Sequence, residues 1–184
     1  MAKHEQNQGW AETAKVLGTS IVLALGIRTF IAQAFYIPSQ SMEPTLQVND
    51  RLIVEKVSYY FRDPERNEVI VFQAPESAIT NCRLPPGTRE DFIKRVVGLP
   101  GEQIEIRDGQ LLINGASVPE PYIAGPPDYN WGPETVPEGA YLVLGDNRNN
   151  SCDGHVWGFL PRSNVVGRSV FRFWPPGRIG ATEN

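Results

Sequence analysis

Cysteine, histidine and methionine are scarce in this 184-residue chain, which contains two of each. The two cysteines, Cys82 and Cys152, supply neither a disulfide framework nor a set of zinc ligands, so we expect no metal site and no other cofactor. A single bridge between them is an alternative to two free thiols if the domain lies in an oxidising compartment. Basic residues are not in excess either. The 17 Lys and Arg against 21 Asp and Glu give a net charge of -4, which argues against a nucleic-acid partner.

Long amphipathic helices are also missing beyond residue 37, where short apolar runs lie between turn residues. The 17 glycines and 16 prolines exceed the average share and favour a turn-rich, strand-rich domain over a helical bundle. Strands are expected in five β-branched runs: RLIVEKV from Arg51, EVIVF from Glu68, FIKRVVGL from Phe92, YLVLG from Tyr141 and VVGRSVFRFW from Val165. These patterns predict a mostly β fold built on antiparallel β-sheet.

The clearest local prediction is a β-hairpin. In QIEIRDGQLLING two alternating strands flank Asp108-Gly109, which is the sequence of a two-residue hairpin turn. The proline-rich segment 119–137 is expected to be a loop, as is the segment 84–87. The chain beyond residue 37 therefore suits one globular domain of short strands and tight turns.

Charge is almost absent from residues 16–37, VLGTSIVLALGIRTFIAQAFYI, in which Arg28 is the one charged side chain. A helix of this length spans roughly 33 Å, enough to cross the hydrocarbon core of a bilayer. We therefore expect an N-terminal tail (1–15), a transmembrane anchor that runs into the first strand (16–37) and a β-rich domain (38–184). A buried core helix and a cleaved signal peptide are the alternatives, but no clear small-x-small cleavage site directly follows the apolar run.

Two prolines bracket two serines in PSQSMEP, from Pro38 to Pro44, directly behind the apolar segment. Proline restricts the backbone on both sides and holds the serines in an extended turn. A serine hydroxyl becomes a good nucleophile when a neighbouring base takes its proton. His4 lies on the far side of the expected membrane span, which leaves His155 and Lys94 as candidate bases for Ser41.

Lys94 lies in the run DFIKRVVGLPG, where strand geometry gives it the same face as Phe92 and Val96. Apolar neighbours disfavour the ammonium form, so burial would lower the pKa of Lys94 from about 10.4 toward about 8. The neutral amine can then accept the serine proton. A surface lysine on an amphipathic edge strand is the alternative that this pattern alone leaves open.

A polar loop, GDNRNNSCDGHVWG, extends from Gly145 to Gly158 behind the run YLVLG. Its Asp and Asn side chains are suited to bond their own backbone, as in a solvated turn. A calcium loop would need acidic ligands set more closely than Asp146 and Asp153.

Together these segments resemble the type I signal peptidases. Four motifs carry the resemblance: PSQSMEPTL around Ser41, RNEVIVF from Arg66, FIKRVVGLPG around Lys94 and GDNRNNSCD near Ser151. It extends from the apolar segment to about Trp174. The resemblance implies a membrane-bound serine endopeptidase of antiparallel β fold that removes signal peptides from exported preproteins after small residues, as in Ala-x-Ala. It also implies the lipid bilayer as a partner, with a cytoplasmic N-terminus and the catalytic domain on the trans side of a plasma or thylakoid membrane.

The resemblance also assigns roles to individual residues. Ser41 would be the nucleophile and Lys94 the general base. The Ser39 hydroxyl and the Ser41 backbone N–H would form the oxyanion hole. Ser151 would orient the Lys94 amine by hydrogen bonding, and Asp153 would support that loop. The residues that match the shallow apolar substrate pockets of the family, with core packing as the alternative, are Phe35, Ile37, Met42, Leu46, Leu52, Val71, Phe92 and Ile93.

The sequence departs from the family pattern at two places. Gly154-His155 follows Asp153 where the family commonly has Ser-Arg, and the ending GHVWG resembles the cyanobacterial and chloroplast branch. Asn67 replaces a common turn glycine, which its tolerance of positive φ permits. His155 also raises the alternative of a Ser41–His155–Asp153 triad, although Asp153 could orient the imidazole only through an unusual local turn.

Two other functions compete with this prediction. A self-cleaving regulatory protease shares the Ser/Lys chemistry but needs a DNA-binding segment and an internal cleavage loop, which residues 1–15 do not supply. A non-catalytic membrane-anchored β-domain would tolerate substitution of Ser41 and Lys94.

If Cys82 and Cys152 do form a disulfide, it would tie the loop before the lysine strand to the Ser151 loop. Its reduction would then loosen the orientation of Lys94.

Overall fold

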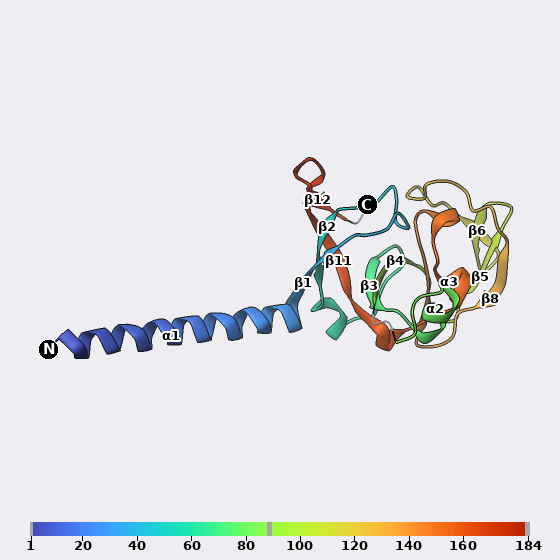
Figure 1. Ribbon diagram of the computed structural model, residues 1–184. Helices are drawn as coiled ribbons and strands as arrows, with labels where there is room; N and C mark the ends of the chain where they lie inside the picture. The colour runs from blue at the N-terminus through green and yellow to red at the C-terminus, as the bar shows by residue number, and fades with distance from the viewer. Residues whose placement is uncertain (1, 88–89, 183–184) are drawn as a thin grey trace.

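The N-terminal part of the chain forms one long helix that projects from a β domain (Figure 1). The computed structural model describes residues 2–87 and 90–182. Helix α1 covers Ala2–Gly26 and passes through a π-helical turn, Ile27–Ile31, into strand β1, Ala32–Tyr36. The stretch Glu12–Ile31 is long and apolar enough to cross a membrane, and none of it is buried against the rest of the chain.

The helix differs from the expected 16–37 anchor at both ends. It begins earlier because Ala, Glu, Gln and Lys, which favour helices, are frequent before residue 16. It ends at Ile31 because the next five residues, Ala32–Tyr36, pair with strand β2, Arg51–Glu55. That pairing satisfies the backbone groups that a continued helix would have bonded internally. The apolar run therefore contains a helix and a strand.

The remaining strands follow one another with short connections. They are β3 (Val69–Gln73), β4 (Asp91–Gly98), β5 (Gln103–Arg107), β6 (Gln110–Ile113), β7 (Ala116–Val118), β8 (Trp131–Thr135), β9 (Ala140–Leu144), β10 (Leu160–Pro161), β11 (Val165–Trp174) and β12 (Gly180–Ala181). The helices among them are α2 (Glu76–Asn81), α3 (Gly154–Trp157) and the single 3-10 turns Ser58–Tyr60, Arg148–Asn150, Arg162–Asn164 and Pro176–Arg178.

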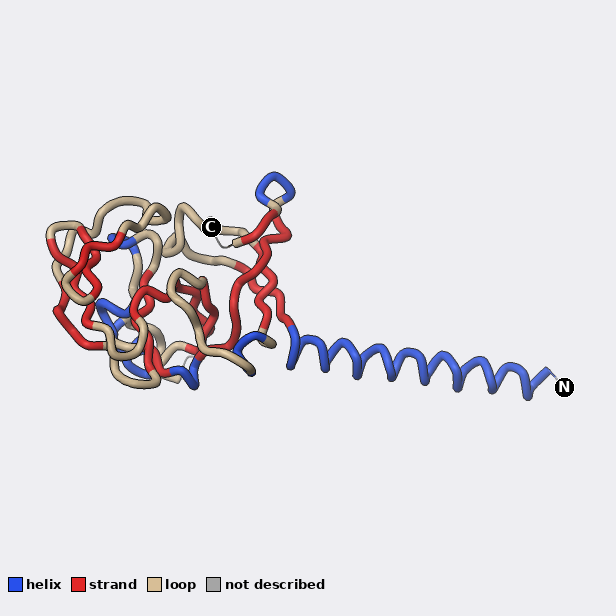
Figure 2. The backbone as a smooth tube through the Cα atoms, turned by 180° about the vertical axis from the view of Figure 1, so that it is seen from behind, coloured by secondary structure: helices blue, strands red, loops and turns tan. Residues whose placement is uncertain are grey.

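Two antiparallel sheets make up the domain, which confirms the mostly β prediction (Figure 2). Within the described ranges the larger sheet has eight strands, in the order β1-β2-β11-β3-β4-β9-β10, with β12 paired to β11. The smaller sheet has the order β7-β6-β5-β8. Strand β4, which carries Lys94, lies between β3 and β9 inside the larger sheet.

The predicted hairpin is confirmed. Strands β5 and β6 pair from Ile104 opposite Ile113 to Arg107 opposite Gln110. Asp108 and Gly109 both have positive φ, as a type I′ turn requires.

The prediction of a loop over 119–137 is wrong for its last part. Residues Trp131–Thr135 form β8, with Trp131 opposite Ile106 of β5. The register shifts between Ile104 and Ile106, and such an irregularity is where a sheet tolerates a proline, here Pro133. Pairing with an open sheet edge thus overrides the local preference for a turn.

Three groups of buried apolar residues form the core. One lies among β3, β4, β9 and α3 and includes Ile70, Phe72 and Trp157. A second lies between the smaller sheet and strands β4 and β9 and includes Val97, Ile104 and Leu142. The third is small and lies directly behind the serine-containing turn: Ile37, Met42, Leu46, Leu52 and Val69, with Ile93 packed against them.

Candidate active site

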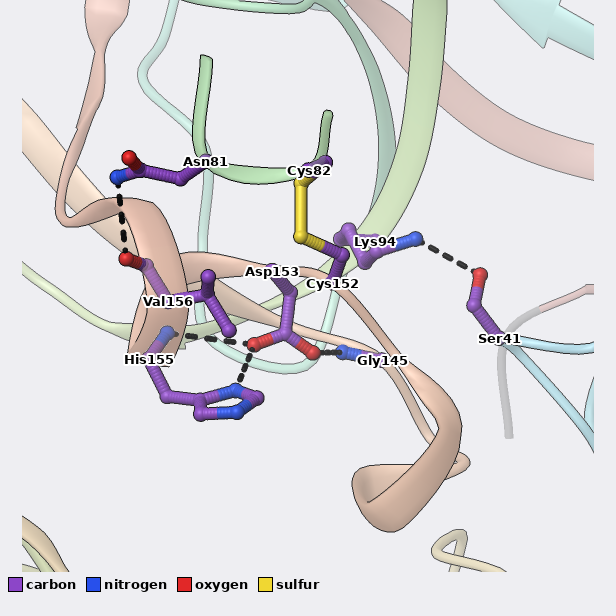
Figure 3. Close-up of a disulfide and its surroundings, with 9 residues drawn as sticks. All are labelled: Ser41, Asn81, Cys82, Lys94, Gly145, Cys152, Asp153, His155 and Val156. Atoms are coloured by element: carbon purple, nitrogen blue, oxygen red, sulfur yellow. Dashed lines mark hydrogen bonds and ion pairs between the residues drawn. A yellow bond between two sulfur atoms is a disulfide. The ribbon is translucent and has the colours of Figure 1, made fainter. Parts of the chain in front are cut away.

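Ser41 and Lys94 lie side by side, as Figure 3 shows. Nζ of Lys94 donates to Oγ of Ser41 at 2.8 Å. Both side chains are withdrawn from solvent, since Ser41 is 8% exposed and Lys94 is 5% exposed. Oγ of Ser39 lies 3.3 Å from Oγ of Ser41. The structure thus brings the three residues that the sequence singled out into one cluster.

The turn that carries Ser41 is fixed by its own backbone and by the core beneath it. Ile37 N–H donates to Asp50 C=O, and Asn49 N–H donates back to Ile37 C=O. Met42, immediately after Ser41, is fully buried. The Ser41 carbonyl accepts from the backbone N–H of Asn147, in the loop that follows β9. The Ser41 segment is therefore held between the core and the polar loop.

Burial dominates the electrostatics of Lys94. It lowers the pKa of the Lys94 ammonium to about 8, although the carboxylates of Asp153 and Asp146 favour the charged form. The amine lies 5.7 Å from the centre of the Phe92 ring, the apolar neighbour that the strand pattern predicted. Once deprotonated, the nitrogen offers a lone pair toward Ser41, so the same contact becomes a hydrogen bond donated by the hydroxyl.

Ser151 does not form the hydrogen bond to Lys94 that the resemblance led us to expect. Lys94 donates instead to Ser41 and to the carbonyl of Ile93, at 2.9 Å. Oγ of Ser151 is buried and has no hydrogen-bond partner among residues 2–87 and 90–182. The orienting role of Ser151 therefore stays a prediction.

The backbone at Gly145 lies close to both Ser41 and Ser151, and sequence reasoning assigned this glycine no role. A Cβ at this position would lie 2.3 Å from Oγ of Ser151 and 2.4 Å from the Ser41 carbonyl oxygen. No side chain fits there. A glycine at the end of a strand, ahead of a polar loop, was the one available signal.

Asp153 organises the polar loop. Its carboxylate accepts from Gly145 N–H at 2.8 Å and from His155 N–H at 3.3 Å, which caps the start of α3 (Figure 3). The same carboxylate bonds Nδ1 of His155 at 2.7 Å, and the imidazole stacks on Tyr129 with ring centres 4.1 Å apart. The sequence analysis expected Asp153 to orient the imidazole only through an unusual local turn, and the N-cap turn of α3 brings the two side chains together.

A buried ion pair lies behind the site and was also missed. Arg95 binds Asp146 through Nε at 2.8 Å and through Nη2 at 2.7 Å. Thr45 donates its hydroxyl to the same carboxylate at 2.5 Å. Because Arg95 follows Lys94 on the strand, it points to the opposite face and joins the Ser41 segment to the Asp146 loop. The sequence signal that could have revealed this ion pair was Arg95, an arginine inside an apolar strand.

A cleft of about 680 Å³ opens beside Ser41 and Lys94. Of the predicted pocket residues, Phe92 and Ile93 line it. Ile37, Met42, Leu46 and Leu52 lie in the core behind it, Val71 is buried in β3, and Phe35 lines a separate cavity. The lining residues that the prediction did not include are Pro38, Gln40, Val48, Cys82, Leu84, Glu90, Asp91, Asn150 and Cys152.

Cys82 and Cys152 are joined by a disulfide that forms part of the cleft wall (Figure 3). Their Cα atoms are 5.9 Å apart although 70 residues separate them in the chain. The bond links the end of α2 to the residue next to Ser151. It therefore connects the segment before β4 to the polar loop.

The chemistry available here is acyl transfer. A hydroxyl, an amine of lowered pKa and a second hydroxyl surround one point in a partly apolar cleft, which suits a nucleophile, a base and an oxyanion donor. Among the described residues, no group of three or more His, Cys, Asp or Glu side chains is arranged to hold a metal ion.

Comparison with known proteins identifies the family. The model of the family described as "Signal peptidase, peptidase S26" matches residues 10–174. The chain belongs to this family. Signal peptidase I of Leptolyngbya laminosa is 59% identical over 169 residues, covering 92% of this chain and 82% of that protein. Probable signal peptidase I-2 of Synechocystis sp. is 53% identical over 171 residues, covering 93% of this chain and 76% of that protein.

The chloroplast branch of the signal peptidase family is also similar. Thylakoidal processing peptidase 1 of Arabidopsis thaliana is 42% identical over 172 residues, covering 94% of this chain and 51% of that protein. These matches confirm the predicted resemblance, including its cyanobacterial and chloroplast side, and make the chain a serine protease of the signal peptidase I type. The matched residues, 10–174, include the apolar stretch Glu12–Ile31 as well as the Ser41–Lys94 cluster.

Proposed function

We propose that this signal peptidase family member cuts signal peptides from exported preproteins with Ser41 as nucleophile and Lys94 as general base. One observation carries the assignment: a buried lysine amine lies 2.8 Å from a buried serine hydroxyl at the wall of the cleft. Burial favours the neutral amine, which is the form that can accept a proton.

The reaction begins when Oγ of Ser41 attacks the scissile carbonyl and Lys94 takes the hydroxyl proton. The Ser39 hydroxyl and the Ser41 N–H meet the negative charge that develops on the carbonyl oxygen. The Lys94 ammonium then gives its proton to the leaving amine, and the signal peptide remains as an acyl ester on Ser41. Water, deprotonated by Lys94, hydrolyses the ester and restores both residues.

The cleft supports a preference for small residues before the cut, of the Ala-x-Ala type. Behind Ile93 lie the fully buried side chains of Met42 and Leu46, and Phe92 packs on the separate core around Phe72, so close-packed side chains back the cleft wall beside Ser41. A small side chain fits such a wall, whereas a large one would have to displace a close-packed core.

Helix α1 is proposed to anchor the domain in the membrane, with the N-terminus in the cytoplasm and the cleft on the trans side. Its stretch Glu12–Ile31 is exposed and apolar, which water would disfavour and a bilayer would accept. Strand β1 leads from the helix directly to the Ser41 turn, so the nucleophile works close to the bilayer surface. A membrane-held signal peptide presents its end at the same height.

The deciding experiment compares full-length wild type with Ser41→Ala and Lys94→Ala on one labelled precursor that ends in Ala-x-Ala. Both variants are expected to lose cleavage by at least about a thousandfold, since each removes an essential part of the dyad. Ser163→Ala, which changes an exposed serine outside the cleft, serves as the matched control and should cleave normally. Substantial activity in Lys94→Ala would overturn the assignment of the base.

A further inference from the structure

Two buried carboxylates act on the charge of Lys94, and their own partners differ. Burial lowers the pKa of the Lys94 ammonium to about 8, and the negative charges of Asp153 and Asp146 oppose that fall. Asp146 is bound by a guanidinium, since Arg95 contacts it through two nitrogens. Among the described residues, the side chain that binds Asp153 is instead the imidazole of His155, 2.7 Å away. The charge of Asp153 is therefore compensated without a permanent cation.

The carboxylate of Asp153 is clamped between this imidazole and the loop beside the dyad. Oδ1 binds Nδ1 of His155 and also accepts from its backbone N–H, whereas Oδ2 accepts from Gly145 N–H at 2.8 Å. An ionised carboxylate can only accept, so Nδ1 of the imidazole carries a hydrogen. Asp153 is fully buried, so water screens its charge little. A change in what His155 donates thus changes the charge that Lys94 experiences.

The imidazole of His155 is fixed on one face by an aromatic ring. It stacks on Tyr129 with ring centres 4.1 Å apart and planes 14° from parallel. Burial raises the pKa of the Tyr129 hydroxyl, so the phenol stays neutral at the pH of catalysis. The charged side chains of Arg148, Glu120 and Asp128 are near enough to act on that hydroxyl, and the first two form an ion pair. The ring of His155 therefore has a set position beside a neutral neighbour.

Asp153 separates the imidazole from the dyad. Figure 3 shows the ring of His155 on the side of Asp153 away from Lys94 and Ser41. The Lys94 amine donates to Ser41 and to a backbone carbonyl, and the ring bonds Asp153. A Ser41–His155–Asp153 triad would need the ring between the carboxylate and the serine. The influence of His155 on the base therefore passes through Asp153.

We propose that His155 is a positioning residue that controls, through Asp153, how readily Lys94 gives up its proton. The proposal rests on the role of general base proposed for Lys94. This chain has a histidine where the family commonly has an arginine, so the two side chains can be compared at one position. An arginine is always charged, whereas an imidazole donates one hydrogen bond and gains a full charge only with a second proton. The residue at position 155 would then set the pH range of cleavage.

The direction of the effect follows from the charges. When Asp153 is poorly compensated, its carboxylate stabilises the Lys94 ammonium, raises its pKa and leaves less neutral amine at pH 7. A permanent cation at position 155 offsets the carboxylate and does the opposite. Because the neutral amine is the form that takes the serine proton, the pH at which cleavage reaches half its maximum moves with the pKa of Lys94.

The test uses two variants of the full-length protein and one peptide substrate. The value of kcat/KM is measured at pH 7 and at pH 10, and a uniform loss of activity cancels in the ratio of the two. A Lys94 pKa of about 8 gives wild type a ratio of about 0.1. His155→Phe, which keeps a ring to stack on Tyr129 and lacks the donor, is expected to lower the ratio about threefold. His155→Arg is expected to raise it about two- to threefold.

Val156→Arg is the matched control. It adds a positive charge one residue further along α3, on a side chain that is 42% exposed and whose charge solvent screens. Its ratio should equal that of wild type. If His155→Phe does not fold, as circular dichroism would show, the shift in His155→Arg decides alone.

Three results would overturn the proposal. The first is an unchanged ratio in the folded His155 variants, and the second is a shift in the same direction in both. The third is a folded His155→Phe that is inactive at every pH, because the imidazole would then be needed for the reaction itself. A wild-type ratio near one would instead overturn the assignment of Lys94 as base, and this proposal with it.

Discussion

The Lys94 amine and the Ser41 hydroxyl are 2.8 Å apart in space and 53 residues apart in the chain. Lys94 is fixed by a central strand, and Ser41 by a turn that packs on the core and on the Asp146 loop. Neither residue lies on a free loop, so the contact is set before substrate arrives. Pre-organisation of this kind reduces the entropy lost in reaching the reactive arrangement.

The rate of cleavage should rise with pH through the titration of Lys94. The ammonium form cannot accept the serine proton, and burial lowers its pKa to about 8. We expect kcat/KM to increase about tenfold per pH unit below pH 8 and to level off above it. Initial rates on a peptide substrate between pH 6 and 10 measure this. A profile that stays flat from pH 6 to 9 would contradict a lysine base.

Lys94→Met should abolish cleavage and yet stabilise the fold. The folded pKa of about 8 lies below the ordinary 10.5, so the unfolded chain binds the proton more tightly. Wild-type stability therefore rises with pH between 8 and 10.5, and below pH 8 the buried lysine costs up to about 3 kcal/mol. Chemical unfolding of both proteins at pH 7 and at pH 10.5 should show an advantage of the variant that shrinks at the higher pH. If the variant is less stable than wild type at pH 7, burial of the Lys94 ammonium does not destabilise the fold.

Gly145→Ala should lower the rate of cleavage by more than its effect on the free energy of unfolding explains. The added methyl group would press on the Ser41 carbonyl and on Oγ of Ser151, so Ser41 must shift. A displacement of about 1 Å near a reacting atom costs about a hundredfold in kcat. Gly177→Ala is the matched control, because a Cβ there meets nothing within 4 Å. If both variants cleave equally well, the close packing around Gly145 has no catalytic importance.

Reduction of the Cys82–Cys152 disulfide should slow cleavage. The bond closes a 70-residue separation, and its loss is expected to reduce the free energy of unfolding by roughly 2–4 kcal/mol. Cys152 adjoins Ser151, so the polar loop behind the dyad loses a fixed point as well. Thiol titration with and without reductant, followed by rate measurements, tests both effects. The Cys82→Ala/Cys152→Ala variant should behave like the reduced protein, and its cleavage rate should no longer respond to reductant. If reductant still slows this variant, the effect does not arise from the Cys82–Cys152 disulfide.

Several features of the fold follow from local sequence. The Asp108-Gly109 turn needs positive φ at two residues, and this pair tolerates it. Asn67 adopts positive φ, as its place in a common glycine position suggested. The strand alternation around Lys94 correctly gave its apolar neighbour Phe92. Such features depend on a few adjacent residues, which is why they can be read without a structure.

Other features depend on partners that are distant in the chain. Strand β8 exists because the edge of β5 lies open to it, and the apolar run changes from helix to strand at Ala32 because β2 is available. Some of the predicted pocket residues line the cleft and others lie in the core. The sequence could not separate the two groups, because apolar side chains are suited to both places.

The sequence by itself determined the protease family, through a serine between prolines, a lysine in an apolar strand and a polar loop that follow in the order of that family. The tertiary structure decided what these residues do to one another. It buried Lys94 beside Ser41, left Ser151 without the expected bond, and set Gly145 against both serines. The reason is physical, because residue types carry reactivity whereas distance, burial and charge at a site arise only when separate segments pack together.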